Sequence, residues 1–328
     1  MLPMDVLTAL KNFERHTGKP VAVLDDEIHE YGTTAQEIID GRVETSRFLI
    51  ADLADILSKQ FKIEIAPFDE EAEWDFLYRM MEESPAFRQY CQQAHASPLI
   101  QINELDNETL EQMLALLQLK QTNRVIDIGC GNGYLTEFIS DRTQAHIVGI
   151  DLSPYAIRLS TERTKHKRDR LAFLVGNINE GIRHVFSGYP GVDTIIALEV
   201  LYAANNLQTT IGELATLLPP KGQMLFIANQ HIEQHGTQGH RLSPDNTYIA
   251  PVIKGQNLPL KVYDLTQNKL RFLERSISLL EQYKAVFEQE GNRDFWAGRM
   301  IYDRKMLKRV QDGLTRRFLY YVPKEECA

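Results

Sequence analysis

The stretch "DIGCGNGYLT", residues 127–136, has glycine at alternate positions in its centre, namely Gly129, Gly131 and Gly133. An apolar run, "RVI" at 124–126, precedes it, and residues of helical character follow it. Glycine permits positive φ and leaves the backbone without a Cβ, so a ligand can approach the main chain closely. The stretch therefore predicts a strand, a tight turn and a helix, with a binding site at the turn.

The same alternation continues along the chain. Four more apolar runs have the length of buried strands, and helical segments lie between most of them. These runs are "HIVGID" at 146–151, "LAFLVG" at 171–176, "VDTIIAL" at 192–198 and "QMLFIAN" at 223–229. Five such strands predict an α/β fold with a doubly wound, mostly parallel sheet, in which ligands bind beyond the carboxyl ends of the strands.

The pattern divides the chain into three regions. Residues 1–119 form a mainly helical N-terminal cap, with one short strand expected within 19–27 and a helix capped by Asn107. Residues 120–230 hold the sheet core. Residues 231–328 are too long for the usual end of such a sheet, so we expect a lid loop, two helices and a final strand at the sheet edge.

Composition and charge limit the partners of this protein. The 328 residues have a net charge of −9 and are 43% hydrophobic, as in ordinary globular proteins. Residues 1–119 hold 9 lysines and arginines against 23 aspartates and glutamates, so we expect this acidic part to attract the more basic remainder. Two runs, 162–170 and 299–317, are locally basic, which indicates either solvated helix faces or an anion-binding role. We expect no nucleic-acid partner.

Targeting and metal signals are weak throughout the sequence. No segment approaches the roughly 20 consecutive apolar residues of a membrane span, and the amino terminus lacks the pattern of a signal peptide. The three cysteines, Cys91, Cys130 and Cys327, have no spacing typical of disulfides or zinc, and His231 and His235 have no third ligand nearby. We expect a cytoplasmic protein with no metal and no membrane partner.

The glycine pattern differs from that of dinucleotide-binding proteins. Their G-x-G-x-x-G fingerprint uses a third glycine to seat a helix against a pyrophosphate, whereas Tyr134 stands at that position here. Asp151 ends the second strand 22 residues after Gly129, which suits a carboxylate that accepts both hydroxyls of a ribose. The sequence thus indicates a ligand with a ribose but without a pyrophosphate.

Four ordered segments carry a family resemblance. They are "VIDIGCGNGYLTEF" at 125–138, "VGIDLSPYAI" at 148–157, "FLVGNIN" at 173–179 and "DTIIALEVLY" at 193–202. In order and spacing they resemble the motifs of class I S-adenosylmethionine-dependent methyltransferases of the small-molecule type with helical additions. The resemblance implies a seven-stranded Rossmann-like sheet with an N-terminal helical cap and a C-terminal helical insertion. It also implies S-adenosylmethionine as the cofactor and a small-molecule methyl acceptor.

The resemblance further implies which residues bind the cofactor. Asp127 would either hold the amino group of the methionine part or bind backbone groups instead, and Asp151 would accept the ribose hydroxyls. Asn177 stands where the family usually has aspartate, and its carbonyl oxygen can still accept from the adenine amino group. Cys130 is expected to be a small buried residue and not a nucleophile. The full expected set is Asp127, Gly129, Cys130, Gly131, Gly133, Asp151, Leu152, Asn177, Ile178, Leu198 and Glu199.

Methyl transfer requires few obligatory side chains. The cofactor already carries a methyl group on a cationic sulfur, so the protein supplies chiefly proximity and orientation. A base is needed only when the acceptor must lose a proton, and the candidates are Glu199, Tyr202 and His231. Glu199 and Tyr202 could instead simply line the pocket.

The acceptor is less well defined by the sequence. The segment "ALEVLY" at 197–202 lacks the Asn or Asp, two prolines and aromatic residue that mark amino-methylating enzymes acting on bases or glutamine. The polar loop 231–248 together with the N-terminal helices is expected to enclose the acceptor, or it is an ordinary surface loop. We therefore expect methyl transfer to a small molecule in an enclosed pocket. The alternatives are a cofactor-binding regulatory protein without turnover and an NAD-linked oxidoreductase that shares the fold.

Overall fold

The computed structural model describes residues 5–31, 33–42, 47–66, 70–180, 191–232, 243–244 and 246–323. The strands are β1 Arg124–Ile128, β2 His146–Asp151, β3 Leu171–Val175, β4 Thr194–Leu198, β5 Gln223–His231, β6 Lys261–Asp264 and β7 Thr315–Val322. The α-helices are α1 Val6–Lys11, α2 Phe13–Thr17, α3 Asp25–Ile28, α4 Ala35–Ile39, α5 Arg47–Lys59, α6 Glu70–Glu83, α7 Pro85–His95, α8 Asn107–Leu117, α9 Tyr134–Thr143, α10 Pro154–Arg163, α12 Leu207–Leu217, α13 Ile249–Gly255, α14 Thr266–Gln289 and α15 Arg293–Gln311. The 3-10 helices are η1 Val21–Leu24, η2 His29–Tyr31, η3 Lys165–Lys167 and η4 Leu201–Ala203.

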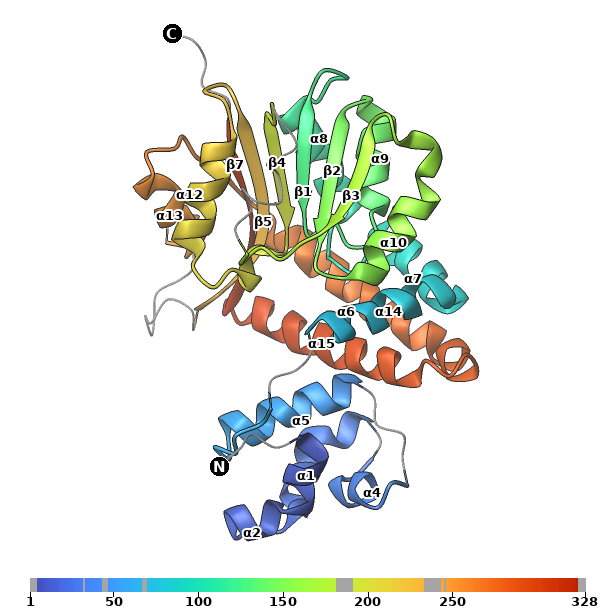
Figure 1. The fold of residues 1–328 in the computed structure, drawn as a ribbon. Helices are drawn as coiled ribbons and strands as arrows, with labels where there is room; N and C mark the ends of the chain where they lie inside the picture. Colours follow the sequence, from blue (N-terminus) through green and yellow to red (C-terminus); the bar gives the residue numbers. More distant parts are fainter. Residues whose placement is uncertain are drawn as a thin grey trace.

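The strands form one seven-stranded sheet in the order β3-β2-β1-β4-β5-β7-β6 (Figure 1). Strands β1 to β5 are parallel, whereas β7 runs antiparallel to both β5 and β6. The strand order reverses between β1 and β4, which is the switch point where such sheets bind ligands. This arrangement confirms the predicted α/β fold with a mostly parallel, doubly wound sheet.

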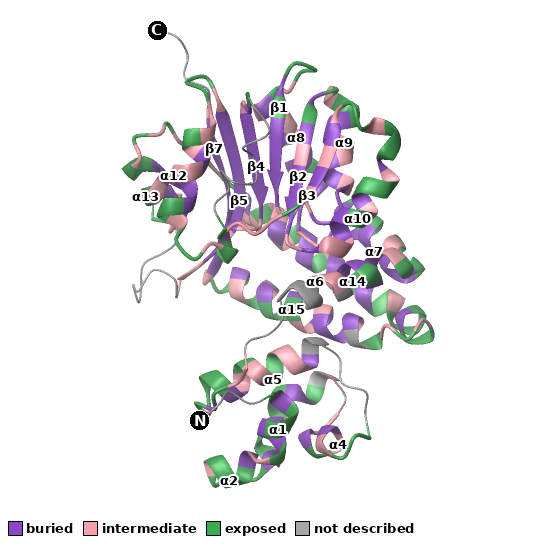
Figure 2. Cartoon of the chain, in the orientation of Figure 1, coloured by how far each residue is buried: buried purple, intermediate pink, exposed green. Residues whose placement is uncertain are grey.

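Each face of the sheet packs against its own set of helices. Val125 of β1 packs with residues of α8, α9 and α10, whereas Ile126 and Ile128 of the same strand pack with residues of α12 and α13. The central strands are buried on both sides (Figure 2). Continuous apolar runs are typical of parallel strands covered by helices on both faces, which explains why these runs were recognisable in the sequence.

The N-terminal helices do not share one core. Helices α1 to α5 bury residues such as Leu10, Phe13 and Leu53 in a separate cluster. Helices α6 and α7 instead pack with α14 and α15, and Phe87 contacts the ring of Phe295 at a centroid distance of 5.1 Å. Residues 5–66 thus form a small helical unit beside a larger body, as Figure 1 also shows.

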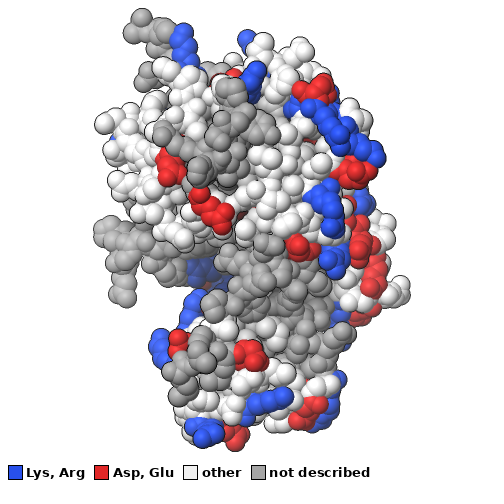
Figure 3. All heavy atoms as spheres, viewed as in Figure 1, with Lys and Arg blue, Asp and Glu red and all other residues white. Residues whose placement is uncertain are grey.

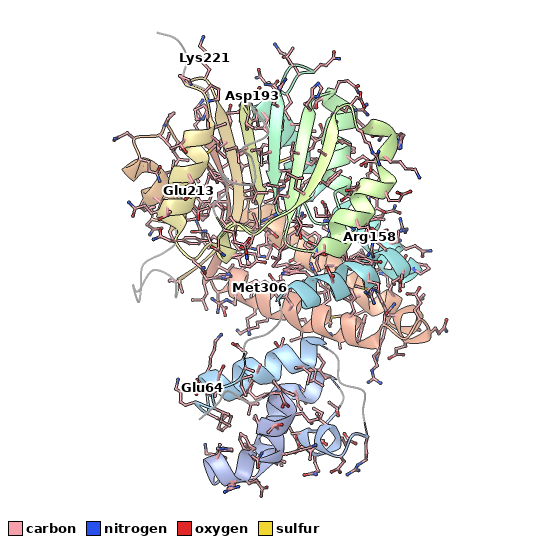
Figure 4. The ribbon with its side chains drawn as sticks, in the orientation of Figure 1. Glu64, Arg158, Asp193, Glu213, Lys221 and Met306 are labelled. Carbon is pink, nitrogen blue, oxygen red and sulfur yellow. The ribbon has the colours of Figure 1, made fainter. Side chains whose placement is uncertain are left out.

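The carboxyl ends of the parallel strands face α6 and α15. Asp193 and Lys221 precede β4 and β5, and Figure 4 shows both at the end of the sheet far from Met306 of α15. The opposite ends of the strands, where ligands bind in this fold, therefore lie over the helical layer.

Three sequence predictions about secondary structure were inaccurate. Residues 21–28 form η1 and α3 instead of a strand, because Val21, Leu24 and Ile28 bury one helical face. Asp106, not Asn107, caps α8, since its side chain accepts from the Thr109 N–H. The final strand β7 lies inside the sheet, and the unpredicted β6 forms the edge. In contrast, the long helix predicted from Leu270 to Phe287 is confirmed as α14, which extends further at both ends.

The basic run 162–170 is neutralised locally. Arg163 pairs with Glu137 at 2.8 Å, and Lys167 and Arg170 pair with Asp141 at 2.6 Å and 2.5 Å. Figure 3 shows basic and acidic side chains close together on this flank of the molecule. The run is therefore a paired surface and not a free anion site.

Candidate active site

A cavity of about 970 Å³ lies at the carboxyl ends of the strands. Its size is at the upper end of the roughly 300–1,000 Å³ range of small-molecule sites. The residues predicted for the site that line it are Asp127, Gly129, Cys130, Gly131, Asp151, Leu152, Asn177, Ile178, Leu198, Glu199, Tyr202 and His231. Gly133 does not line the cavity; it caps α9 in a left-handed conformation. We call the part around Asp127, Gly131 and Asp151 the turn end, and the part around Glu199, Asn229 and Arg299 the far end.

The space left by the glycines is used mainly by the protein itself. Gly129 and Gly131 have φ values of 72° and 54°, which favour glycine. A Cβ on Gly129 would lie 2.8 Å from the Cβ of Val200, and a Cβ on Gly131 would lie 2.9 Å from the hydroxyl of Tyr78. An added Cβ at either glycine would therefore meet a side chain of the protein, and the approach of a ligand to this backbone stays a prediction.

Asp151 organises the turn end. Its carboxylate accepts from the Gly131 N–H at 2.8 Å and from the Ser153 N–H at 3.0 Å. Burial raises the pKa of Asp151, although these backbone donors partly offset the effect. A buried carboxylate with further acceptor capacity on a cavity suits a diol such as a ribose.

Asp127 lies deeper in the turn end. Its carboxyl accepts from the hydroxyl of Thr136 at 2.6 Å, and burial raises its pKa to about 7. Among the described residues no cation pairs with it. A ligand ammonium group would supply the missing counter-charge.

Two other predicted residues have roles fixed by their neighbours. The side-chain oxygen of Asn177 accepts from the Asn179 N–H at 2.9 Å in a local turn, and its role toward the adenine stays a prediction. Asn179 in turn donates to the Ala203 carbonyl at 2.9 Å, which joins the loops after β3 and β4. Burial raises the pKa of the Cys130 thiol well above its ordinary value, so the thiol stays protonated and is no nucleophile.

Helix α6 covers the turn end. Tyr78 is buried against Gly131, and Trp74 stacks on Tyr78 with a centroid distance of 5.8 Å. Asp75 binds the hydroxyl of Ser153 and accepts from the Tyr155 N–H at 3.2 Å. These contacts fix α6 to the start of α10, so residues remote in sequence form the roof of the cavity.

The C-terminal part of α6 is fixed to the start of α9. Glu82 accepts from the side-chain amide of Asn132 at 2.9 Å and from the hydroxyl of Tyr134 at 3.1 Å. The guanidinium of Arg163 lies 3.9 Å from the centre of the Tyr134 ring. A carboxylate and an aromatic ring thus occupy the amino end of this helix.

Buried charges build the far end. Glu199 has a φ of 54° and its carboxylate pairs with Arg317 of β7 at 2.7 Å. Arg317 also donates to the Glu104 carbonyl at 2.7 Å, and the Glu104 carboxylate forms a buried ion pair with Lys269 of α14. A non-glycine residue with positive φ carries a conformational cost, so the surrounding contacts must hold Glu199 in this conformation.

Arg299 of α15 completes the far end. Its guanidinium pairs with Asp303 at 3.0 Å and donates to the Ile102 carbonyl at 3.1 Å. Its Nη2 and the side-chain oxygen of Asn229 are buried, and neither has a hydrogen-bond partner within the described part of the chain. Both residues line the cavity.

The remaining base candidates differ in position. Tyr202 lies in η4 with 63% of its surface exposed, so it belongs to the mouth of the cavity. His231 ends β5, and its Nδ1 lies 2.8 Å from the hydroxyl of Thr315. Most of the predicted lid loop, residues 233–242 and 245, lies outside the described residues.

Sequence reasoning missed most of the far end. Arg317 had one signal, a charge inside the apolar run of β7, and Arg299 lies in the basic run 299–317. Glu104 and Lys269 had no signal, because neither lies in a motif and they meet only through the tertiary fold.

Comparison with known proteins identifies a domain in this chain. Residues 119–281 match the family model described as "Methyltransferase domain". The chain carries a class I S-adenosylmethionine-dependent methyltransferase domain. This domain includes β1 to β6 and most of α14, and its cofactor is S-adenosylmethionine.

Curated relatives are similar to part of this chain. The malonyl-[acyl-carrier protein] O-methyltransferase of Priestia megaterium is 33% identical over 126 residues, covering 38% of this chain and 40% of the relative. The ubiquinone biosynthesis O-methyltransferase of Alkalilimnicola ehrlichii is 27% identical over 144 residues, covering 44% of this chain and 56% of the relative. The chain therefore spans about half the length of the curated relatives it matches.

A solved structure is similar over more of the chain. Phosphoethanolamine N-methyltransferase 2 of Haemonchus contortus, solved with S-adenosyl-L-methionine, superposes with a TM-score of 0.60 at 16% identity. The match covers 86% of this chain and 61% of that one. At this identity the likeness shows the fold alone. No helix in the described ranges is long and apolar enough to cross a bilayer.

Proposed function

We propose that this protein transfers the methyl group of S-adenosylmethionine to a small-molecule acceptor held in the cavity. One observation carries the proposal: the turn end, with Asp127 and Asp151, and the far end, with Glu199 and Arg299, belong to the same cavity of about 970 Å³. The first part suits the cofactor and the second leaves room for an acceptor beside it. The curated relatives named above, which are O-methyltransferases, support methyl transfer by this chain.

The residues of the turn end fit the cofactor chemically. Asp151 would accept from the ribose hydroxyls, with Leu152 and Ile178 against the adenine. Asp127 would bind the ammonium of the methionine part, which accounts for a buried carboxyl whose pKa is raised to about 7. The cofactor supplies an electrophilic methyl group, so this end of the site has only to bind and orient.

The far end would hold and orient the acceptor. Glu199 at the end of β4 is fixed by its ion pair with Arg317, so its carboxylate serves better as a positioning group than as a free base. His231 remains the stronger base candidate, because its Nδ1 contact with Thr315 orients the ring beside the cavity. Helices α6 and α15 would exclude bulk water from the reacting atoms.

The geometry disfavours the oxidoreductase alternative. Dinucleotide-binding folds place a pyrophosphate at the amino end of the first helix. Here Tyr134 stands at the position of the third glycine, and Glu82 binds the Asn132 amide and the Tyr134 hydroxyl, so side chains of the protein occupy that place.

Calorimetry separates the alternatives. We expect the full chain to bind S-adenosylhomocysteine at micromolar strength and to show no binding of NAD. In Asp151→Asn, affinity for S-adenosylhomocysteine should fall by about 1.5–3 kcal/mol, the range for hydrogen bonds to a charged group. Asp193→Asn, at the opposite end of the sheet, is the control and should leave the affinity unchanged (Figure 4). Binding of NAD alone would overturn the proposal.

A second assay distinguishes an enzyme from a regulatory protein. Labelled S-adenosylmethionine is incubated with the protein and a broad panel of small acids, amines, phenols and thiols. Transfer of label to one class is expected. Cofactor binding without transfer to any member would favour the regulatory alternative.

A further inference from the structure

The far end contains a cation whose hydrogen-bonding capacity is only partly used. The Arg299 side chain is 10% exposed; its Nε pairs with Asp303 and its Nη1 donates to the Ile102 carbonyl. The Nη2 group is buried, and no acceptor lies in reach among the described residues. Burial of a guanidinium N–H without an acceptor is unfavourable. This group therefore indicates a ligand that supplies an oxygen.

The other internal charges at this end are already balanced. Lys269 pairs with the Glu104 carboxylate, and Arg317 pairs with Glu199. Lys305, which follows Arg299 on α15 and also lines the cavity, makes no ion pair within the part of the chain that the structure describes. Two cationic donors of the cavity lining thus remain for a ligand: Nη2 of Arg299 and Nζ of Lys305.

These donors suit a carboxylate better than a phosphate monoester. Two donors match the two oxygens of a carboxylate, whereas a phosphate has three strongly accepting oxygens and a second charge. The carboxylates of Glu104 and Asp303 lie around Arg299, and Asp52 lines the cavity too, so a second negative charge would be repelled.

The rest of the wall defines the body of the ligand. Helices α6 and α15 contribute Trp74, Leu77, Met81, Phe295 and Ile301 to the lining. An apolar wall beside a cationic end favours an amphipathic molecule, because burial of its apolar part adds binding energy at the wall.

We infer that the methyl acceptor carries a carboxylate, which Arg299 and Lys305 bind at the far end while its apolar part packs against α6 and α15. This inference rests on the proposed function, since it names the substrate class of the same cavity. It also assigns a role to the basic run 299–317, of which Arg299 and Lys305 are members.

Matched acids and amides test the inference. The full chain is saturated with S-adenosylhomocysteine and titrated with phenylpropanoate and hexanoate, with the corresponding primary amides, and with hexyl phosphate. We expect the acids to bind and the amides to bind at least about tenfold more weakly, the difference made by a charged hydrogen bond. Equal binding of acids and amides, absence of acid binding at millimolar concentration, or a preference for hexyl phosphate overturns the inference.

Variants of α15 test which residues bind the carboxylate. Arg299→Lys should weaken acid binding by about tenfold, because lysine lacks the planar fork, and Lys305→Gln by about threefold at low salt. Lys308→Gln is the matched control, since Lys308 lies on the same helix outside the cavity and pairs with Asp312. Should Arg299→Lys fail to fold, Lys305→Gln and Lys305→Glu carry the test. An equal loss in Lys308→Gln contradicts the inference.

Failure of the proposed function and failure of the carboxylate site give different experimental results. Loss of S-adenosylhomocysteine binding in the parent chain removes the proposed function, while the acid and amide titrations of the cofactor-free protein still test the carboxylate site. Intact cofactor binding with no preference for acids removes the carboxylate site alone.

Discussion

The two ends of the cavity are built in opposite ways. At the turn end, Asp127, Gly131 and Asp151 come from two neighbouring strands and the turns that follow them, within 25 residues of sequence. At the far end, Glu104 and Lys269 form an ion pair across 165 residues. The first end is a local motif that many proteins of this fold share, and the second is an assembly of distant charges. This difference indicates that binding of the shared cofactor depends on the local motif. Specificity for an individual acceptor depends on the long-range contacts.

We expect the largest effect on stability from disruption of the buried ion pair at the far end. Glu104→Gln leaves Lys269 buried without its counter-charge, so the free energy of unfolding in urea should fall by about 3–5 kcal/mol. The double variant Glu104→Gln with Lys269→Met is the control and should recover most of the loss, because no unpaired charge remains. A loss below about 1 kcal/mol in the single variant would show that the pair does not hold this end together.

At the turn end, removal of the charge of Asp127 should instead stabilise the fold. Burial raises the pKa of Asp127 from its ordinary value of 3.8 to about 7, so the folded chain binds more protons than the unfolded chain between these pH values. The ionised carboxyl therefore destabilises the fold as the pH rises towards 7, by up to about 4 kcal/mol. Asp127→Asn should gain stability over the parent at pH 8 and lose this gain near pH 4.

Urea unfolding at several pH values measures this difference. S-adenosylhomocysteine binding by Asp127→Asn, followed in parallel, should weaken, because the ammonium loses its counter-charge. A stability difference between the variant and the parent that stays constant with pH would contradict the assignment of Asp127 as a buried carboxyl held for a cation.

The glycine turn offers a smaller and more local test. In Gly131→Ala the new Cβ meets the Tyr78 hydroxyl at a φ of 54°, so we expect a loss of about 2–3 kcal/mol in unfolding free energy and weaker cofactor binding. Gly18→Ala is the matched control: its φ is 68° but no atom lies within 4 Å of the new Cβ. It should lose only about 1 kcal/mol, the cost of the backbone conformation. Equal losses would show that Tyr78 does not press on the turn.

We expect the smallest effect on stability from an exposed ion pair that lies near the buried pair of Glu104 and Lys269. Arg271 and Glu108 join the same two segments as Lys269 and Glu104, at 2.7 Å, but their side chains are 48% and 71% exposed. Glu108→Gln should change the unfolding free energy by less than about 1 kcal/mol, and added salt should reduce the change further. A loss as large as that of Glu104→Gln would mean that burial does not explain the contrast.

The sequence by itself determined the sheet core and the turn end. The runs that became β1 to β5 were recognisable because strands covered on both faces must be continuously apolar. Asp151 was predicted because it ends such a run, where an acidic residue is unexpected, whereas Asp127 was predicted only through the family resemblance. The acidic N-terminal part does pair with basic residues further along, through Glu104 and Glu108 with Lys269 and Arg271.

Only the tertiary structure decided the roof and the far end. The role of Tyr78 against Gly131 depends on how α6 docks, and the insertion of β7 between β5 and β6 places Arg317 beside Glu199. Periodicity in a sequence reports which face of an element is buried, but not which distant element covers it. A buried charge such as Lys269 looks like any surface lysine until folding brings its partner to it, because the pairing depends on distance in space and not on spacing along the chain.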